Sequence, residues 1–233
     1  MKFKIQDSIF DAFPELQIGI VVARGINNTG ESAEILALLR DQEREIRQKF
    51  TSETLSQEPK IESWRKAYSS FGAKPKKYRC SVENLYRMIL EGLALHHINT
   101  VVDIYNYISI KHLVPVGGDD IDHVDGDITL TFAKGDELFK ELNSDEVKSP
   151  NEGEVIYVDR NEVLCRRWNW RECDKSKMTQ NTKNITLVVE GLPPVNKDEI
   201  KLIIDELAEL IQSHVGGEIK TFIVNKAKRE IEF

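Results

Sequence analysis

The sequence predicts an α+β fold in which a central β-sheet or sandwich core is flanked by helices. Helical apolar patterns dominate the first half of the 233-residue chain, alternating strand patterns follow, and a long helix and a strand end it. Strict alternation of strands and helices is absent, and no glycine-rich phosphate loop follows a strand. These observations disfavour a nucleotide-binding α/β fold, and the length suits a single domain over residues 1–233.

The first part of the chain predicts one strand and two helices. Leu16–Ala23 is rich in β-branched side chains, which is typical of a buried strand. Ser32–Phe50 has the apolar spacing of an amphipathic helix, and we expect its charged run, Arg40–Lys49, to be a solvated face. Residues 51–60 predict a loop, and Ile61–Ser70 predicts a short helix.

Two further helices are predicted in the middle of the chain. Ser81 can cap a helix that reaches about Leu95, with a buried stripe formed by Val82, Leu85, Ile89 and Leu93. A second helix covers Ile98–Ile110. On it, Asn99, Asp103 and Asn106 form a polar line, which we interpret as holding a neighbouring loop rather than as a catalytic group.

Strand patterns follow Pro115. Ile128–Phe132 alternates apolar and polar residues, and further strands are expected at Glu154–Asp159, Val163–Arg167 and Ile185–Val189. Asn196 and Glu199 have the spacing of a capping box at the start of a long helix. Gly216 and Gly217 end that helix, and Ile219–Val224 predicts the closing strand.

Composition restricts the function classes. The net charge is −7, and proteins that bind nucleic acid over their whole surface are usually basic, so any such site must be a local basic patch. The three cysteines lack disulfide or zinc spacing and indicate a reducing compartment. Without a signal-peptide core or an apolar run of membrane length, we expect a cytoplasmic protein that does not contact a membrane.

The segment Arg166–Arg171 is the strongest candidate site, because it holds three arginines and two tryptophans. Guanidinium groups bind phosphate or carboxylate, and tryptophans stack on bases or arginines. On a strand, Arg167, Asn169 and Arg171 would share one face, and Arg166 would lie on the other with the tryptophans. The alternative, given equal weight, is a structural strand whose arginines pair with acids such as Asp159 or Glu172.

Two other charged segments stand out. The first holds Lys74, Lys76, Lys77 and Arg79; it could contact a nucleic-acid backbone, but a solvated loop is favoured. The second, Gly117–Asp127, is rich in aspartate. It fails the EF-hand spacing, so a turn-rich loop is favoured over a metal site, and its paired glycines could admit a ligand close to the backbone.

Several motifs resemble the B3/B4 domain of the bacterial phenylalanyl-tRNA synthetase β subunit, and most closely its free-standing relatives. The clearest is Ile98–Tyr107, which is similar to that domain's Asn-x-Val-Val-Asp helix. The other matching residues follow in family order: Ser81, Leu85, Gly92, Pro115, Asp120, Gly126, Ile128, Gly135, Glu137, Val155–Asp159, Thr182, Asn184, Ile185 and Glu190. The resemblance spans about residues 74–190, with a strand–helix extension at about 1–70 and a helix–strand unit at about 196–224.

The resemblance implies a chamber that receives the aminoacylated 3′ end of tRNA, rather than DNA, and removes a wrong amino acid. The expected chemistry is attack by water on an ester, which needs no cofactor, metal or protein nucleophile. Gly117, Gly118, Asp120, Thr182 and Glu190 would shape the amino-acid pocket. The terminal phosphates or an amino-acid carboxylate would be met by Arg166, Arg167 and Arg171.

Two positions depart from the family pattern. Gly117 replaces a pocket histidine, and the bulky segment Arg166–Trp170 replaces a glycine-rich run. Two alternatives therefore remain beside hydrolysis of mischarged tRNA in trans: an RNA-binding module without catalysis, and a pocket for a free amino acid or similar carboxylate.

Overall fold

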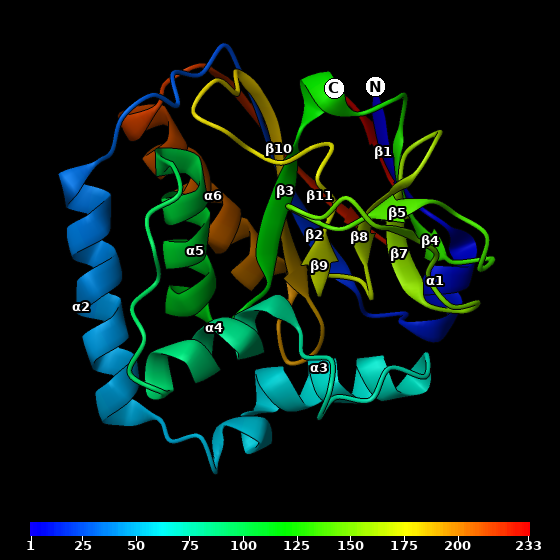
Figure 1. Cartoon of the computed structure of the whole chain (residues 1–233), viewed down its shortest axis with the longest axis horizontal. Coiled ribbons are helices and arrows are strands. Elements are labelled where there is room, and N and C mark those ends of the chain that lie inside the picture. The colour runs from blue at the N-terminus through cyan, green and yellow to red at the C-terminus, as the bar shows by residue number, and fades with distance from the viewer.

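A computed structural model describes all residues, 1–233 (Figure 1). The helices are α1 (Asp7–Ala12), α2 (Ala33–Lys49), α3 (Pro59–Ser70), α4 (Ser81–Leu90), α5 (Thr100–His112) and α6 (Lys197–His214), with short 3-10 turns at Leu55–Gln57 and Ile121–His123. The strands are β1 (Lys2–Ile5), β2 (Gln17–Arg24), β3 (Val116–Asp120), β4 (Ile128–Phe132), β5 (Phe139–Lys140), β6 (Val147–Lys148), β7 (Val155–Val158), β8 (Val163–Arg166), β9 (Arg171–Glu172), β10 (Asn184–Gly191), β11 (Glu218–Asn225) and β12 (Glu230–Glu232).

The strands form two main sheets, and the fold is α+β as predicted. A four-stranded antiparallel sheet has the order β11-β2-β10-β3. A six-stranded sheet has the order β12-β1-β4-β7-β8-β9, in which only β1 and β4 run parallel. β5 and β6 pair as a separate hairpin. No helix is both long enough and apolar enough to cross a membrane.

The helices lie mainly on one side of the four-stranded sheet, and the six-stranded sheet lies on its other side (Figure 1). α6 packs on β2, α5 lies beside α6, and α2 lies outside α5, while α3 runs below the sheets. One continuous apolar core extends from Phe3 to Ile231. Because β2 is an inner strand and β1 pairs with β12, the segment expected as an N-terminal extension is part of this core.

Side-chain caps fix the starts of three long helices, of which the sequence predicted the one at Asn196. The oxygens of Ser32, Asn99 and Asn196 each accept a backbone N–H from the first turn of their helix. The cap predicted at Ser81 is wrong, because Ser81 is itself the first residue of α4 and its hydroxyl bonds to no backbone N–H. A second expectation on this side of the molecule is also wrong: α4 ends at Leu90, which leaves Leu93 52% exposed. The charged run of α2 faces solvent as expected except at Glu43, which turns inward and accepts hydrogen bonds from Arg40 and the backbone of Leu95.

Two residues of the predicted polar line, Asn99 and Asp103, form hydrogen bonds that hold neighbouring segments, as expected. Asn99 donates to the carbonyl of Met178 and accepts from Asn28, and Asp103 accepts from the backbone of Ile98 and contacts His97. Both side chains are buried, so these bonds satisfy groups that would otherwise destabilise the helix.

The glycine-rich start of the aspartate-rich segment is a strand rather than a loop. β3 pairs with β10, and a Cβ at Gly118 would lie 2.0 Å from the carbonyl oxygen of Thr186. Gly118 therefore makes room for the neighbouring strand. The sequence prediction failed here because glycine and aspartate disfavour strands locally, and pairing along β10 overrides that preference.

Candidate functional site

The Arg166–Arg171 segment is a tight turn between two strands. β8 ends at Arg166 and β9 begins at Arg171, and in between Arg167 and Trp168 have φ angles of 46° and 67°. Such left-handed conformations are uncommon for residues other than glycine and interrupt the alternation of a strand. The expected division of side chains between two strand faces is therefore wrong.

Arg166 and Arg167 are both buried against one acid, Glu154. Arg166 donates to both carboxylate oxygens, at 3.1 and 2.9 Å, and Arg167 lies 2.8 Å from Glu154 Oε1. The arginine side chains are only 9% and 6% exposed. Neither guanidinium is free to meet a phosphate, so the structural interpretation of these two arginines holds, with Glu154 as the partner in place of Asp159 or Glu172.

The aromatic residues of the turn fix its surroundings. Trp168 is fully buried, and its ring centroid lies 4.8 Å from that of Phe13 and 5.0 Å from that of Trp64. The Arg167 guanidinium lies 3.8 Å from the ring of Tyr78 and 4.6 Å from that of Trp170. The turn thereby anchors α1 and α3 and holds the basic loop at residues 74–79 beside it.

Asn169 links the turn to Glu190. The Asn169 amide donates to Glu190 Oε2 at 2.6 Å, and its carbonyl oxygen accepts from Tyr68 at 2.8 Å. Tyr157 donates to the other oxygen of Glu190 at 2.5 Å. Burial raises the pKa of Glu190 to about 7, although both donors and the nearby indole of Trp168 oppose the rise. Glu190 thus positions Asn169 from behind the cavity wall.

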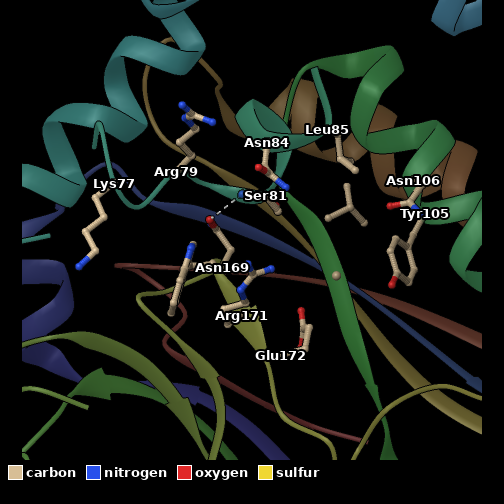
Figure 2. A pocket seen from close by; sticks show the side chains of 13 residues that line it. Lys77, Arg79, Ser81, Asn84, Leu85, Tyr105, Asn106, Asn169, Arg171 and Glu172 are labelled. Atoms are coloured by element: carbon tan, nitrogen blue, oxygen red, sulfur yellow. Dashed lines mark hydrogen bonds between the residues drawn. The ribbon is translucent and has the colours of Figure 1, made fainter. Parts of the chain in front are cut away.

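A cavity of about 280 Å³ opens in front of Asn169 (Figure 2). The first turn of α4, one face of α5, the start of β3 and β9 surround it. Its walls are Lys77, Arg79, Ser81, Asn84, Leu85, Tyr105, Asn106, Val116, Gly117, Asn169, Trp170, Arg171 and Glu172. The predicted residues Gly117, Asn169 and Arg171 therefore lie together, with the side chains of Glu172 and Tyr105 among them (Figure 2).

Glu172 is the one acidic side chain of this cavity, and it makes no hydrogen bond or ion pair. Burial and the neighbouring acids Asp119 and Glu190 raise its pKa well above the ordinary range. A Cβ at Gly117 would lie 2.9 Å from Glu172 Oε1, so Gly117 leaves the space that this carboxyl occupies. The space beside Gly117 is thus filled by an acid from β9.

Three polar groups at the cavity also lack partners. Ser81 Oγ is buried without a hydrogen bond. The side chains of Tyr105 and Asn106 line the same cavity and make no hydrogen bond to another side chain or to the backbone (Figure 2). Ser81 is the first residue of α4, and its helix has no side-chain cap at Cys80. The positive end of the α4 dipole therefore lies at this cavity.

A second cavity, of about 510 Å³, adjoins the first and shares Tyr105 and Glu172 with it. It is lined by Ile98, Asn99, Val102, Tyr105, Gly118, Leu142, Asn143, Glu172, Cys173, Ser176, Lys177, Met178, Thr179 and Gln180. The two cavities together form a cleft between α5, β3 and β9.

The cations of the basic loop are free. Lys74, Lys76 and Lys77 are exposed and Arg79 is half-buried, and none of them pairs with an acid. The predicted loop is present between α3 and α4. Arg171 is exposed as well, but its guanidinium lies 3.2 Å from Glu141. The positive charge at the cleft that is not paired with an acid therefore comes from the loop.

Two predicted pocket residues lie away from the cleft. Thr182 donates to Asp120 at 2.7 Å, and both side chains are buried. Asp120 also accepts from the backbone of Asp122, and Thr182 from that of Thr179. Their role is to fix the loops at the end of the four-stranded sheet.

The cleft offers neither a thiol nucleophile nor a metal centre. Burial raises the pKa of Cys80 and Cys165 and brings that of Cys173 to about 11. A thiol in that state is a poor nucleophile. No three His, Cys, Asp or Glu side chains are arranged to hold a metal ion.

The residues that the sequence analysis missed are Glu172, Tyr105, Ser81 and Asn106 as members of one cavity. Glu172 entered only as a candidate partner of the arginines. No spacing rule could place it against Gly117, because β9 and β3 belong to different sheets. The one signal in the sequence was that both departures from the family pattern, Gly117 and the charged segment Arg166–Trp170, were expected in the same pocket.

Comparison with known proteins identifies the family. The B3/4 domain family matches residues 63–216, more than half of the chain, and the protein belongs to this family. No curated protein matches the sequence. Among solved structures the chain is similar to an N-terminal fragment of the phenylalanyl-tRNA synthetase β-subunit from Pyrococcus horikoshii, with 13% sequence identity and a TM-score of 0.49. That alignment covers 96% of this chain and 54% of the fragment, so the chain spans about half the fragment's length.

Proposed function

We propose that the protein binds the aminoacylated 3′ end of tRNA in this cleft and hydrolyses the ester of a mischarged tRNA in trans. The observation that carries the proposal is that one cavity is lined both by an acid without a partner and by cations without a partner. Glu172 lies in the cavity, and Lys77 and Arg79 line its rim. Aminoacyl-tRNA has the complementary charges, because its amino acid carries an ammonium group and the RNA to which the amino acid is esterified carries phosphates. Membership of the B3/4 family supports the same assignment.

The basic loop is the part of the cleft suited to the tRNA backbone. Lys74, Lys76 and Lys77 are exposed, and Lys77 and the half-buried Arg79 line the cavity. Lysine and arginine contacts to phosphate give affinity without reading base sequence. Because the chain carries a net charge of −7, we expect this contact to be local and strongly weakened by salt.

The hydrolytic step uses water rather than a protein nucleophile. Water adds to the ester carbonyl, the bond to the ribose oxygen breaks, and that oxygen takes up a proton, releasing amino acid and tRNA. The negative charge that develops on the carbonyl oxygen would be stabilised by the N-terminal end of α4 and by the Ser81 hydroxyl. The polar groups of Tyr105 and Asn106 are placed to orient the water or the ribose.

A deacylation assay over a panel of mischarged tRNAs tests the proposal. We expect loss of amino acid from at least one tRNA to be faster than in buffer, and Arg79→Ala to raise the tRNA concentration needed for half-maximal rate. Arg44→Ala is the matched control, because it removes the same charge from an exposed site on α2. If no tRNA in the panel is hydrolysed, the proposed enzymatic activity is contradicted. If tRNA then still binds in a salt-dependent way, the protein is an RNA-binding module without catalysis.

A free amino acid is a second candidate ligand. The same cavity holds the carboxyl of Glu172 and the guanidinium of Arg171, the two charges that a zwitterion needs. Thermal stabilisation by free amino acids, without any by tRNA, would favour this function over the first.

A further inference from the structure

The second cavity is placed to receive a different part of the ligand from the first. The two cavities meet at Tyr105 and Glu172, which line both of them. Lys77 and Arg79 line only the first cavity. The phosphate-bearing end of a ligand therefore belongs in the first cavity, and the second is open to a group without phosphates.

The wall of the second cavity is suited to an apolar group. Ile98, Val102, Leu142 and Met178 contribute side chains to it, and Ile98 and Leu142 are 57% and 40% exposed. A ligand that covered these two side chains would remove apolar surface from water. The volume, about 510 Å³, lies within the range of small-molecule sites.

Three of the polar side chains in this wall are already engaged. Asn99 bonds to the backbone of Met178, Ser176 donates to Asp119, and Lys177 pairs with Asp174. Glu172, at the junction with the first cavity, has no such partner. The cleft therefore presents cations at one end, an apolar compartment at the other and one unpaired carboxyl between them.

We infer that Glu172 binds the α-ammonium group of the aminoacyl moiety and that the second cavity holds its side chain. The substrate class is then aminoacyl groups that have a free α-amino group and a bulky, mainly apolar side chain. The inference rests on the proposed function for the position of the ester. The substrate's α-carbon carries three groups that the cleft would separate. If the carbonyl lies near Ser81 and the side chain near Val102, the ammonium group lies between them, where it meets the carboxyl of Glu172.

The ionisation of Glu172 supports this assignment. Burial and nearby acids favour its neutral form in the empty cleft, and a bound ammonium would favour the carboxylate. Binding of a cationic amine should therefore release a proton, and binding of an N-acetylated analogue should not.

Calorimetry with amino-acid amides tests the inference, because these probes carry no tRNA. We expect methioninamide to bind the wild-type protein at least about tenfold more tightly than glycinamide. We expect N-acetylmethioninamide to bind at least about tenfold more weakly than methioninamide. The two free amines, methioninamide and glycinamide, should show a binding heat that depends on the buffer's ionisation enthalpy, which reports proton release, and N-acetylmethioninamide should not.

Variants assign the two effects. Glu172→Gln should remove the penalty for acetylation and keep the preference for methionine, and Leu142→Trp, which fills the half-exposed mouth, should do the opposite. Glu45→Gln, which removes an exposed acid of α2, should change neither. Equal wild-type affinities for methioninamide and glycinamide, or for the acetylated and free amines, would overturn the inference. If the amides bind in the expected order of affinity but no mischarged tRNA is hydrolysed, only the proposed hydrolysis is contradicted.

Discussion

Replacing Glu190 by glutamine should change how the stability of the protein depends on pH. Burial raises the pKa of Glu190 from 4.5 to about 7. Between these values the folded state holds a proton that the unfolded state has lost, so the free energy of unfolding of the wild-type protein falls as pH rises. Each unit of pKa is worth about 1.4 kcal/mol, so the full difference is about 3 kcal/mol.

Urea unfolding at several pH values, from about pH 5 to about pH 8, measures this difference. The wild-type protein should lose about 3 kcal/mol more over this range than Glu190→Gln does. The same pH slope in both proteins would refute the account of Glu190 as a buried acid with a raised pKa.

Three further predictions concern the walls of the cleft, each measured by urea unfolding. Glu154→Ala should lower the free energy of unfolding by about 3–5 kcal/mol, because Arg166 and Arg167 would both be buried without their acid; a loss below about 1 kcal/mol contradicts the pairing. Gly118→Ala should destabilise by roughly 1–3 kcal/mol, since its Cβ would meet the β10 backbone, and no loss would mean that β3 pairs differently. Glu172→Gln should stabilise the protein at alkaline pH and not at acid pH, and a loss of stability there would show that its carboxyl has a partner.

The sequence predicted most of the elements because their signals are local. Apolar periodicity identified the long helices, and the capping-box spacing at Asn196 placed the start of α6 to within a residue. β1 and β12 were not predicted, because each is short and charged. They stabilise each other by pairing, although they lie at opposite ends of the sequence. β3 was not predicted, because two glycines weaken the strand pattern.

The site was less predictable for a physical reason. Arg166–Arg171 was identified as important, but its backbone turns through two left-handed residues that no strand or turn rule assigns to arginine and tryptophan. That turn carries the arginines inward to Glu154 and brings Glu172 to the cavity. The composition of the segment thus indicated a site, while the choice between arginine and glutamate as the ligand-binding group depended on tertiary packing.

The most direct test of the account compares one tRNA in two forms: uncharged, and carrying methionine through a non-hydrolysable amide at its 3′ end. If the cleft recognises the aminoacyl group through Glu172, the charged form should bind the wild-type protein at least about tenfold more tightly, and Glu172→Gln should lose most of that difference. Equal affinity of the wild-type protein for the two forms would contradict the central claim that this cleft binds an aminoacylated end.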